Sequence, residues 1–278
     1  MTERAVSSVI PADAVINDAQ MRLLRALPRE QTHAIGPFVF VDHYRHTGRR
    51  GIGDRPHPHA GIEVVSYLLD GSVEHRDSMG NKDQLSAGDV QFIRAGRGML
   101  HAEQPLSGRH GLQLWVSLPP ELKLVEPSYT SIRAADIPQI EGSGFHLYVI
   151  AGTVNGVRGP MQLSGEAVFA RLQLSADCET TLTVAPAAEL GVYVLQGSLE
   201  ISGTQLSAGD LATLGTGTEI RILARGNVVC EVALIGGSPV QGELLFSGPF
   251  VMDTPERLSQ ARRDFIEGRM GHLDGVPY

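Results

Sequence analysis

The sequence predicts an all-β protein made of two antiparallel β-sandwich or jelly-roll barrels, with one short helix near the C-terminal end. Two observations carry this prediction. The 278-residue chain is rich in turn-forming residues, with 32 Gly and 16 Pro, and its hydrophobic residues, 42% of the total, fall in short runs. One pair of sequence blocks also occurs twice in the same order, which indicates a duplicated domain. The length is sufficient for two domains of ordinary size.

The repeat consists of two matching segments in each half of the chain. YLLDGSVE at 67–74 matches YVLQGSLE at 193–200, and QLSAGDV at 84–90 matches QLSAGDL at 205–211. We expect the first segment to be a strand that turns at its glycine and returns. We expect SAGD to be the turn of a hairpin between two apolar runs.

The boundary between the halves falls near residues 128–152, where Pro and Gly interrupt the strand pattern. We therefore expect a first domain at 1–135 and a second domain at 136–278. In the first domain, apolar and other residues alternate over 112–118, which is the period of a strand with two different faces. At the end of the second domain, residues 254–269 open with Thr-Pro-Glu-Arg and continue with helical spacing, which predicts one helix docked on a barrel.

Composition argues against several classes of partner. The formal net charge is −8, and no basic stripe with interleaved aromatic residues is present, so we expect no direct nucleic-acid binding. The chain has no run of 18 apolar residues and no recognisable signal peptide, which predicts a cytoplasmic protein without a membrane span. The two cysteines, Cys178 and Cys230, cannot form a disulfide framework or a zinc ribbon by themselves.

The histidines point to a metal site in the first half. His57 and His59 lie in RPHPHAGIE, and His101 and Glu103 have the same spacing after a glycine-rich turn, whereas the second copy of the repeat has no histidine. In a strand, residues i and i+2 lie on one face, about 6.5–7 Å apart. A lone His-x-His is often surface decoration, but two such pairs on neighbouring strands would bring three imidazoles and one carboxylate together.

This donor set favours one divalent transition metal, namely Fe(II), Mn, Co, Ni or Zn, over Mg or Ca, which prefer shells made only of oxygen. Four protein ligands around an octahedral ion leave two positions for substrate, dioxygen or water. Because the imidazoles bind only when deprotonated, we expect the metal to leave as the pH falls below about 6 to 6.5.

The spacing of these residues resembles the motifs of the cupin superfamily. The first cupin motif is Gly, five residues, His-x-His, three or four residues, Glu and a further Gly. It is matched here, with one extra residue before the last glycine, by Gly51, His57, His59, Glu63 and Gly71. The second motif matches loosely, with Arg94 where many cupins have Pro and with His101 later than usual.

More specifically, the chain resembles the pirin family over most of its length. The matching stretches are GPFVFVDHY (36–44), RPHPHAGIEVVSYLLDG (55–71), EHRDSMGN (74–81), AGDVQFIRAGRGMLHAE (87–103), HGLQLWVSLP (110–119) and GPFVMDTPERLSQARRDFIEGRMG (248–271). The resemblance implies a bicupin with one iron-type site in the N-terminal barrel, bound by His57, His59, His101 and Glu103. Glu63 is a ligand in some other cupins but is not expected to bind the metal in pirins, so its role is open. If it faces inward, it is an outer partner of the metal or a base, whereas a bulge at Gly61 would turn it away.

The resemblance also implies an activity, a metal-dependent dioxygenase of the quercetin 2,3-dioxygenase type that opens a flavonol with O2, most simply with Fe(II). Either Glu103 or Glu63 would then take the proton of the flavonol hydroxyl. The alternative is a non-enzymatic, iron-dependent co-regulator whose affinity for a partner protein changes with the redox state of the iron. His43 and His75 are weaker candidates, for the pocket mouth and the surroundings of the metal, and Trp115 is expected in the core or an interface.

Overall fold

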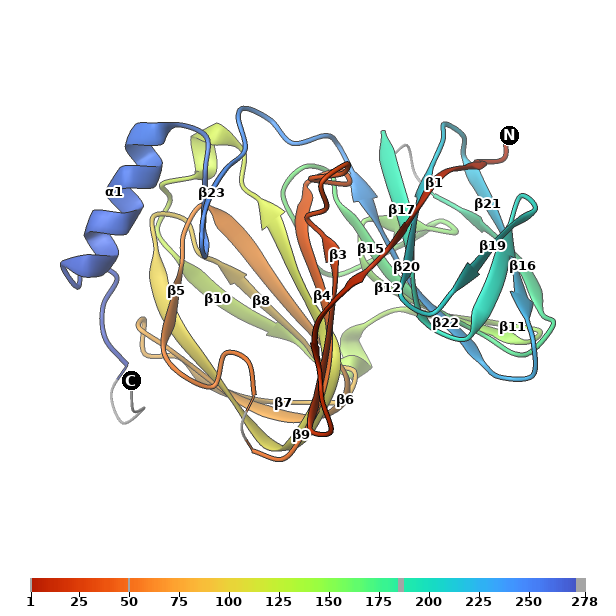
Figure 1. The fold of residues 1–278 in the computed structure, drawn as a ribbon, viewed down its shortest axis with the longest axis horizontal. Coiled ribbons are helices and arrows are strands. Elements are labelled where there is room, and N and C mark those ends of the chain that lie inside the picture. Colours follow the sequence, from red (N-terminus) through yellow and green to blue (C-terminus); the bar gives the residue numbers. More distant parts are fainter. Residues whose placement is uncertain (1, 50, 185–187, 274–278) are drawn as a thin grey trace. The chain divides into compact units, whose positions relative to one another are not determined.

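The computed structural model describes residues 2–49, 51–184 and 188–273, and it consists of β-strands with a single α-helix in the part of the chain that it describes (Figure 1). The all-β prediction is confirmed. Two compact units are present. The histidine unit comprises Ala14–Leu23, Phe40–Ala134 and Val240–Tyr278, and the leucine unit comprises Met1–Asp13, Leu24–Val39 and Ala135–Pro239. Within the described residues, no helix is both long and apolar enough to span a membrane.

A nine-stranded sheet contains most strands of the histidine unit, in the order β10-β8-β6-β9-β4-β3-β2, with β5 paired to β9 and β7 paired to β6. The strands are β2 (Asp13–Asn17), β3 (Met21–Leu27), β4 (Phe38–Thr47), β5 (His57–His59), β6 (Ile62–Asp77), β7 (Lys82–Ser86), β8 (Val90–Arg94), β9 (Met99–Ser117) and β10 (Ser128–Ile132). The two longest strands, β6 and β9, run antiparallel from the Ile62–Ser117 pair to the Asp77–His101 pair. Short 3-10 helices follow at Pro120–Leu122 and Ala134–Asp136.

Two local predictions about the repeat are wrong because β6 is longer than expected and pairs with several strands. Gly71 does not reverse the chain, because β6 continues through it with a bulge and pairs with β9 on both sides. A side chain on Gly71, whose φ is +87°, would lie 2.0 Å from the carbonyl oxygen of Gly108, so only glycine fits there. SAGD does not close a hairpin either, since β7 and β8 both pair with β6, at residues 72–76 and 63–67.

The second copy of the repeat differs at its glycine but has the same SAGD turn. Gly197, with φ +76°, takes the chain from β17 (Glu189–Gln196) in one sheet to β18 (Ser198–Ile201) in another. In the two SAGD turns, the Asp89 carboxylate accepts a hydrogen bond from the Ser86 amide (3.0 Å) and Asp210 accepts one from Ser207 (2.8 Å). The repeat therefore encodes the SAGD turn, which both copies close with the same contact between Asp and Ser.

The leucine unit is a sandwich of a seven-stranded and a four-stranded sheet. The first has the order β1-β20-β17-β22-β15-β12-β11 and adds β1 (Val6–Pro11), β11 (Gln139–Gly142), β12 (Phe145–Ala151), β15 (Val168–Leu174), β20 (Asp210–Leu214) and β22 (Cys230–Gly237). The second has the order β16-β21-β18-β19 and adds β16 (Glu179–Thr183), β19 (Thr204–Ser207) and β21 (Glu219–Arg225). A small hairpin joins β13 (Thr153–Val154) to β14 (Val157–Arg158).

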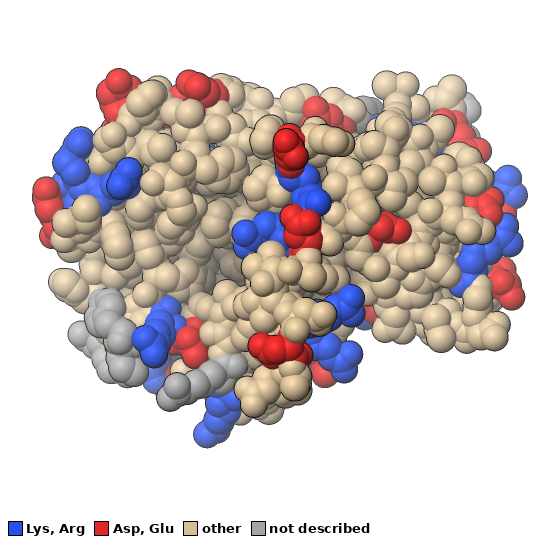
Figure 2. Space-filling model, in the orientation of Figure 1, with Lys and Arg blue, Asp and Glu red and all other residues tan. Residues whose placement is uncertain are grey.

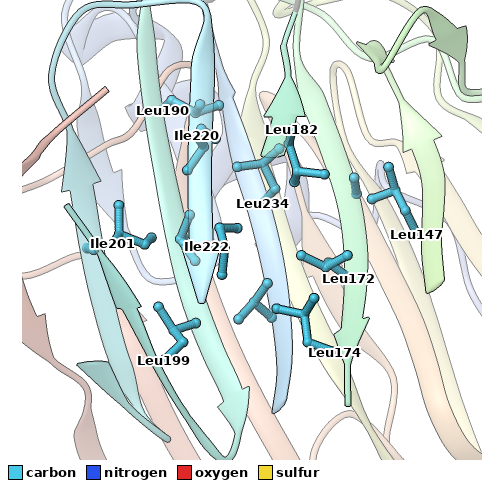
Figure 3. Packing of buried hydrophobic residues seen from close by; sticks show 14 of the residues in the cluster. Leu147, Leu172, Leu174, Leu182, Leu190, Leu199, Ile201, Ile220, Ile222 and Leu234 are labelled. Carbon is cyan, nitrogen blue, oxygen red and sulfur yellow. The ribbon is translucent and has the colours of Figure 1, made fainter. Parts of the chain in front are cut away.

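The core of the leucine unit is entirely apolar. Figure 3 shows side chains from both sheets, such as Leu172 of β15 and Ile222 of β21, pointing into the same space. Leu182 and Leu234, which are fully buried there, belong to the four-stranded and the seven-stranded sheet respectively. Burial of these leucine, isoleucine and valine side chains stabilises the unit through the hydrophobic effect.

The two compact units divide the chain between Ala134 and Ala135, and each also takes residues from the other side of that point. The last strands, β23 (Leu245–Ser247) and β24 (Phe250–Met252), and the helix α1 (Pro255–Ile266) belong to the histidine unit, although they lie in the second half of the chain. The apolar side of α1 accounts for this, because Ala261 lies in one buried cluster with Leu100 and Ala102 of β9. Conversely, β1 pairs with β20 in the leucine unit.

The predicted helix itself is confirmed. Pro occupies its first turn, and the Thr254 hydroxyl accepts a hydrogen bond from the Arg257 amide (3.2 Å), which is a normal N-cap.

On the face of the molecule shown in Figure 2, acidic and basic side chains of the described residues are interspersed and form no continuous basic area. The absence of direct nucleic-acid binding stays a prediction.

Candidate metal centre

Strand pairing brings the two predicted ligand segments together. β5 runs antiparallel to the start of β9, with His57 opposite His101 and His59 opposite Met99. One ring nitrogen from each of His57, His59 and His101 lies within 4.8 Å of the others. The ring centroids are separated by 4.2 Å for His57 and His101, 5.0 Å for His59 and His101, and 5.1 Å for His57 and His59. The three imidazoles therefore converge on one point.

The hydrogen bonds of these histidines fit a metal. His59 and His101 are 2% and 0% exposed, and neither nitrogen of either ring makes a hydrogen bond of normal geometry among the described residues, although the Pro249 backbone lies near the His59 ring. Buried polar atoms without a partner are rare in proteins, and metal coordination satisfies them. The Nδ1 of His57 donates to the Arg55 carbonyl (2.9 Å), which leaves its Nε2 lone pair for an ion. Three imidazole nitrogens suit a divalent transition metal.

Burial keeps these imidazoles neutral. It lowers the pKa of His57, lowers the pKa of His59 to about 3 with a further contribution from His57, and brings the pKa of His101 well below its usual range. Neutral imidazole is the form that binds metal. The ordinary imidazole pKa predicts loss of metal below about pH 6 to 6.5. The lowered pKa values of these rings predict that a bound metal stays in place to a lower pH.

Glu103 is next to this cluster but outside the 4.8 Å group formed by the histidines. A side chain on Gly53 would lie 3.2 Å from Cε1 of His57 and 3.9 Å from Oε2 of Glu103, so these two residues flank Gly53. The Oε1 of Glu103 accepts hydrogen bonds from Ser66 (2.8 Å) and Gln91 (2.6 Å). Both partners are buried polar residues on the same side of the sheet.

A buried arginine holds the other oxygen of Glu103. Arg109 Nη1 donates to Oε2 of Glu103 (2.7 Å), Nε donates to Nε2 of His46 (3.0 Å), and Nη2 donates to the Ile52 carbonyl. Burial alone would raise the pKa of Glu103, but the charge and hydrogen bond of Arg109, together with Ser66, bring it down to about 2. Glu103 is therefore a carboxylate at neutral pH, suited to bind a cation but weak as a base.

The structure does not bring Glu63 together with the histidines. Gly61, with φ +75°, interrupts the alternation between His59 and Glu63, and β6 is regular from Ile62 to Leu68. Because successive residues of a strand face opposite sides, Glu63 lies on the face opposite to Ser66, which contacts Glu103. Glu63 is fully buried and accepts two hydrogen bonds from Arg94, at 2.9 and 2.8 Å.

Two of the weaker candidates have clear places. His75 is fully buried, its ring lies 5.6 Å from that of His101, and its Nε2 contacts the Asp77 carboxylate (3.1 Å), as in a hydrogen-bonded strand histidine. His43 contacts His110 through their Nε2 atoms (2.6 Å), and burial, with smaller contributions from His110 and two arginines, lowers its pKa to about 3.

Sequence reasoning missed the polar residues around Glu103, namely Ser66, Gln91 and Arg109. Ser66 and Gln91 each interrupt a short apolar run, at 64–68 and 90–93, and this pattern could have revealed them. Trp115 is buried with the core, as expected, and its ring packs edge-on against His59 at 5.2 Å.

Comparison with known proteins gives consistent matches over most of the chain. The family model described as Pirin matches residues 20–116, and the one described as Pirin C-terminal cupin domain matches residues 169–271. Pirin from Homo sapiens is 32% identical over 257 residues, which cover 90% of this chain and 88% of that protein. Pirin-1 from Arabidopsis thaliana is 31% identical over 243 residues, covering 85% and 84%.

Solved structures share the fold. A crystal structure of quercetin 2,3-dioxygenase from Acinetobacter baumannii superimposes with a TM-score of 0.86 and 28% identity, covering 98% of this chain and 93% of that one. The bacterial pirin YhhW from Escherichia coli, solved in complex with nickel(II), has a TM-score of 0.66 and 23% identity, covering 84% of this chain and 100% of that one. These similarities confirm the two-domain cupin architecture that the sequence predicted.

Proposed function

Because this chain belongs to the pirin family, as its motifs predicted, we propose that it is a metal-dependent dioxygenase that opens a flavonol such as quercetin with O2. The observation that carries the proposal is the convergence of three neutral imidazoles, of which His59 and His101 are buried, beside the carboxylate of Glu103. Similarity to the Acinetobacter baumannii protein named quercetin 2,3-dioxygenase, over nearly the whole chain, supports the choice of substrate.

We assign one divalent ion, with Fe(II) as the favoured metal and Mn, Co, Ni or Zn as chemically compatible ones, to His57, His59, His101 and Glu103. The unpartnered nitrogens of His59 and His101 provide the fit on the imidazole side. Glu103 provides an oxygen donor that stays ionised at neutral pH. A bound divalent metal supplies Lewis acidity toward the flavonol hydroxyl.

The protein side chains contribute orientation and charge. Ser66, Gln91 and Arg109 fix the Glu103 carboxylate from three directions, as outer partners of metal ligands commonly do. The Glu103–Arg109 pair is neutral as a whole, so it does not cancel the charge of an added cation. That positive charge favours the ionised form of the flavonol hydroxyl. With a pKa of about 2, Glu103 serves in this proposal as a ligand and not as the proton acceptor.

The test is oxygen uptake and carbon monoxide release with quercetin, on protein loaded anaerobically with Fe(II). We expect one O2 consumed and one CO released for each flavonol opened to its ester product. His101→Ala should abolish both, whereas His146→Ala, which changes a histidine of the leucine unit, should leave both unchanged. A metal-loaded protein that consumes no O2 with any flavonol would refute the proposal, and partner capture under Fe(II) and Fe(III) would then test the co-regulator alternative.

A further inference from the structure

Trp115 is the only tryptophan of the chain, and it lies beside the histidine cluster. In the pairing of β6 with β9, Trp115 stands opposite Val64 and Gln113 stands opposite Ser66. Ser66 contacts Glu103, and residues i and i+2 of a strand share a face, so Trp115 is on the metal-facing side of the sheet.

Two aromatic contacts fix the indole ring. Its plane stacks on Phe40 with a centroid distance of 4.0 Å and an interplanar angle of 13°. Against His59 the centroid distance is 5.2 Å and the angle is 74°, which is an edge-to-face contact. Phe40 and Trp115 are each 9% exposed, so the pair is largely enclosed and the ring has little freedom to turn.

The polar atom of this ring has no structural use. The indole Nε1 is buried, and within the described part of the chain no hydrogen-bond acceptor contacts it. A buried N–H without an acceptor costs free energy, and buried tryptophans usually find one. Phenylalanine would keep the stacking without this cost. A tryptophan at this position is therefore explained best by an acceptor that arrives with a ligand.

We propose that Trp115 contacts the substrate, with its indole N–H donating to an oxygen of a planar aromatic ligand bound next to His59. Phe40 holds the indole in place for this contact. The ligand class is a hydroxylated aromatic compound with a carbonyl beside the hydroxyl, in which one oxygen binds at the histidine cluster and the other accepts from Trp115. This choice of ligand rests on the proposed function, whereas the unpaired donor beside His59 does not.

Anaerobic binding of 3-hydroxyflavone to the Fe(II)-loaded protein tests the proposal without turnover. The dissociation constant is measured from the absorption of the flavonol, for the wild type and for Trp115→Phe. We expect the variant to bind 3-hydroxyflavone about fivefold to tenfold more weakly, as for the loss of one hydrogen bond. Its affinity for Fe(II) should stay within about twofold of the wild type, which shows that the site is intact.

The single tryptophan gives a second readout that needs no variant. Because all tryptophan emission of the wild type comes from Trp115, bound 3-hydroxyflavone should quench it in proportion to occupancy. Equal affinities of the wild type and Trp115→Phe, or binding that leaves the emission unchanged, would overturn the inference.

The same data separate this inference from the dioxygenase proposal. Binding that weakens in Trp115→Phe, combined with no O2 uptake by the wild type, supports the tryptophan contact and refutes the dioxygenase. Turnover in the wild type, combined with unaltered flavonol affinity in Trp115→Phe, supports the dioxygenase and refutes the tryptophan contact. A wild type that binds no 3-hydroxyflavone refutes both.

Discussion

At the scale of single residues, Arg109 is the side chain on which the site most depends after the ligands themselves. Its three nitrogens each hold a different group, the Glu103 carboxylate, the His46 ring and the Ile52 carbonyl, and its guanidinium lies 4.8 Å from the Tyr44 ring centre. The planar guanidinium spreads its donors over three nitrogens and so can reach groups on different sides of the side chain, whereas a lysine has all its donors on one atom. Glu103 therefore owes its position and its low pKa largely to one buried cation.

Replacing Arg109 by methionine should weaken both metal binding and the fold. The change leaves a buried carboxylate without its cation, which typically costs about 3–5 kcal/mol, and outer-partner losses typically weaken metal affinity about 10–100-fold. Urea unfolding and competition with a chromophoric chelator measure the two effects. Arg221→Met is the matched control, because Arg221 pairs with Glu179 at the exposed surface. Wild-type metal affinity in Arg109→Met would contradict this role.

The His43–His110 contact predicts a loss of stability in acid. Burial lowers the pKa of His43 to about 3, against 6.5 in an unfolded chain. Between these values the unfolded state binds the extra proton, so stability falls as the pH drops from 6.5 toward 3. His43→Phe, which keeps a ring against His110, should remove about 1–2 kcal/mol of the loss between about pH 6.5 and 4.5. Identical pH profiles from urea unfolding of the two proteins would show that His43 titrates normally.

At the scale of elements, Lys123 joins three parts of the histidine unit. It is 1% exposed, and its ammonium donates to the Gly61 carbonyl (2.8 Å), the Ser117 hydroxyl (2.9 Å) and the Val251 carbonyl (2.9 Å). Gly61 precedes β6, Ser117 ends β9 and Val251 lies in β24, the strand before α1. Gly61 also follows His59 by two residues, so the same contact helps to place a ligand of the proposed metal.

Lys123→Met should therefore loosen the link between the C-terminal segment and the metal site. Methionine fills a similar volume but donates no hydrogen bonds, so three acceptors lose their donor, and we expect a destabilisation of about 2–4 kcal/mol. Hydrogen exchange should rise in β24 and α1, and metal affinity should fall. Lys82→Met, at an exposed lysine paired with Glu74, is the control. If exchange in α1 does not change, the helix is held by its apolar contacts alone.

The elements also show what a sequence can and cannot predict. The clustering of His57, His59 and His101 was predictable because i, i+2 spacing is a local property of a strand. The helix was predictable because Thr254 and Pro255 mark its start. The route of the chain at Gly71 was not predictable, because a bulge and a hairpin share the same local sequence pattern. Glu63 was uncertain for a similar reason, since only the φ of Gly61 decides which face it joins. The contacts of Arg109 join loops and strands far apart in sequence, and a single sequence carries no sign of them.

At the scale of the whole molecule, the two units have different interiors. The repeat keeps its turn chemistry in both, but the histidine unit has a polar centre and the leucine unit an apolar one. Leu182→Ala, a truncation in the apolar core, should cost about 2–5 kcal/mol of stability and leave metal affinity unchanged. His59→Ala should instead weaken metal binding. It thereby removes the stabilisation that a bound metal gives, about 2.7 kcal/mol at a hundredfold excess over the dissociation constant.

Thermal unfolding with and without Fe(II), under anaerobic conditions, distinguishes these two outcomes. A metal-dependent gain in melting temperature that persists in Leu182→Ala and disappears in His59→Ala is the expected result. A gain that survives in His59→Ala would place the metal elsewhere on the chain.

The most direct test of the central claim, that His57, His59, His101 and Glu103 form one metal centre, is the metal content of the purified protein after anaerobic loading with Fe(II) and dialysis. The arrangement of the site predicts one ion per chain in the wild type and none in His101→Ala. An empty wild type, or a His101→Ala variant that holds as much iron as the wild type, would contradict the assignment and with it the proposed dioxygenase.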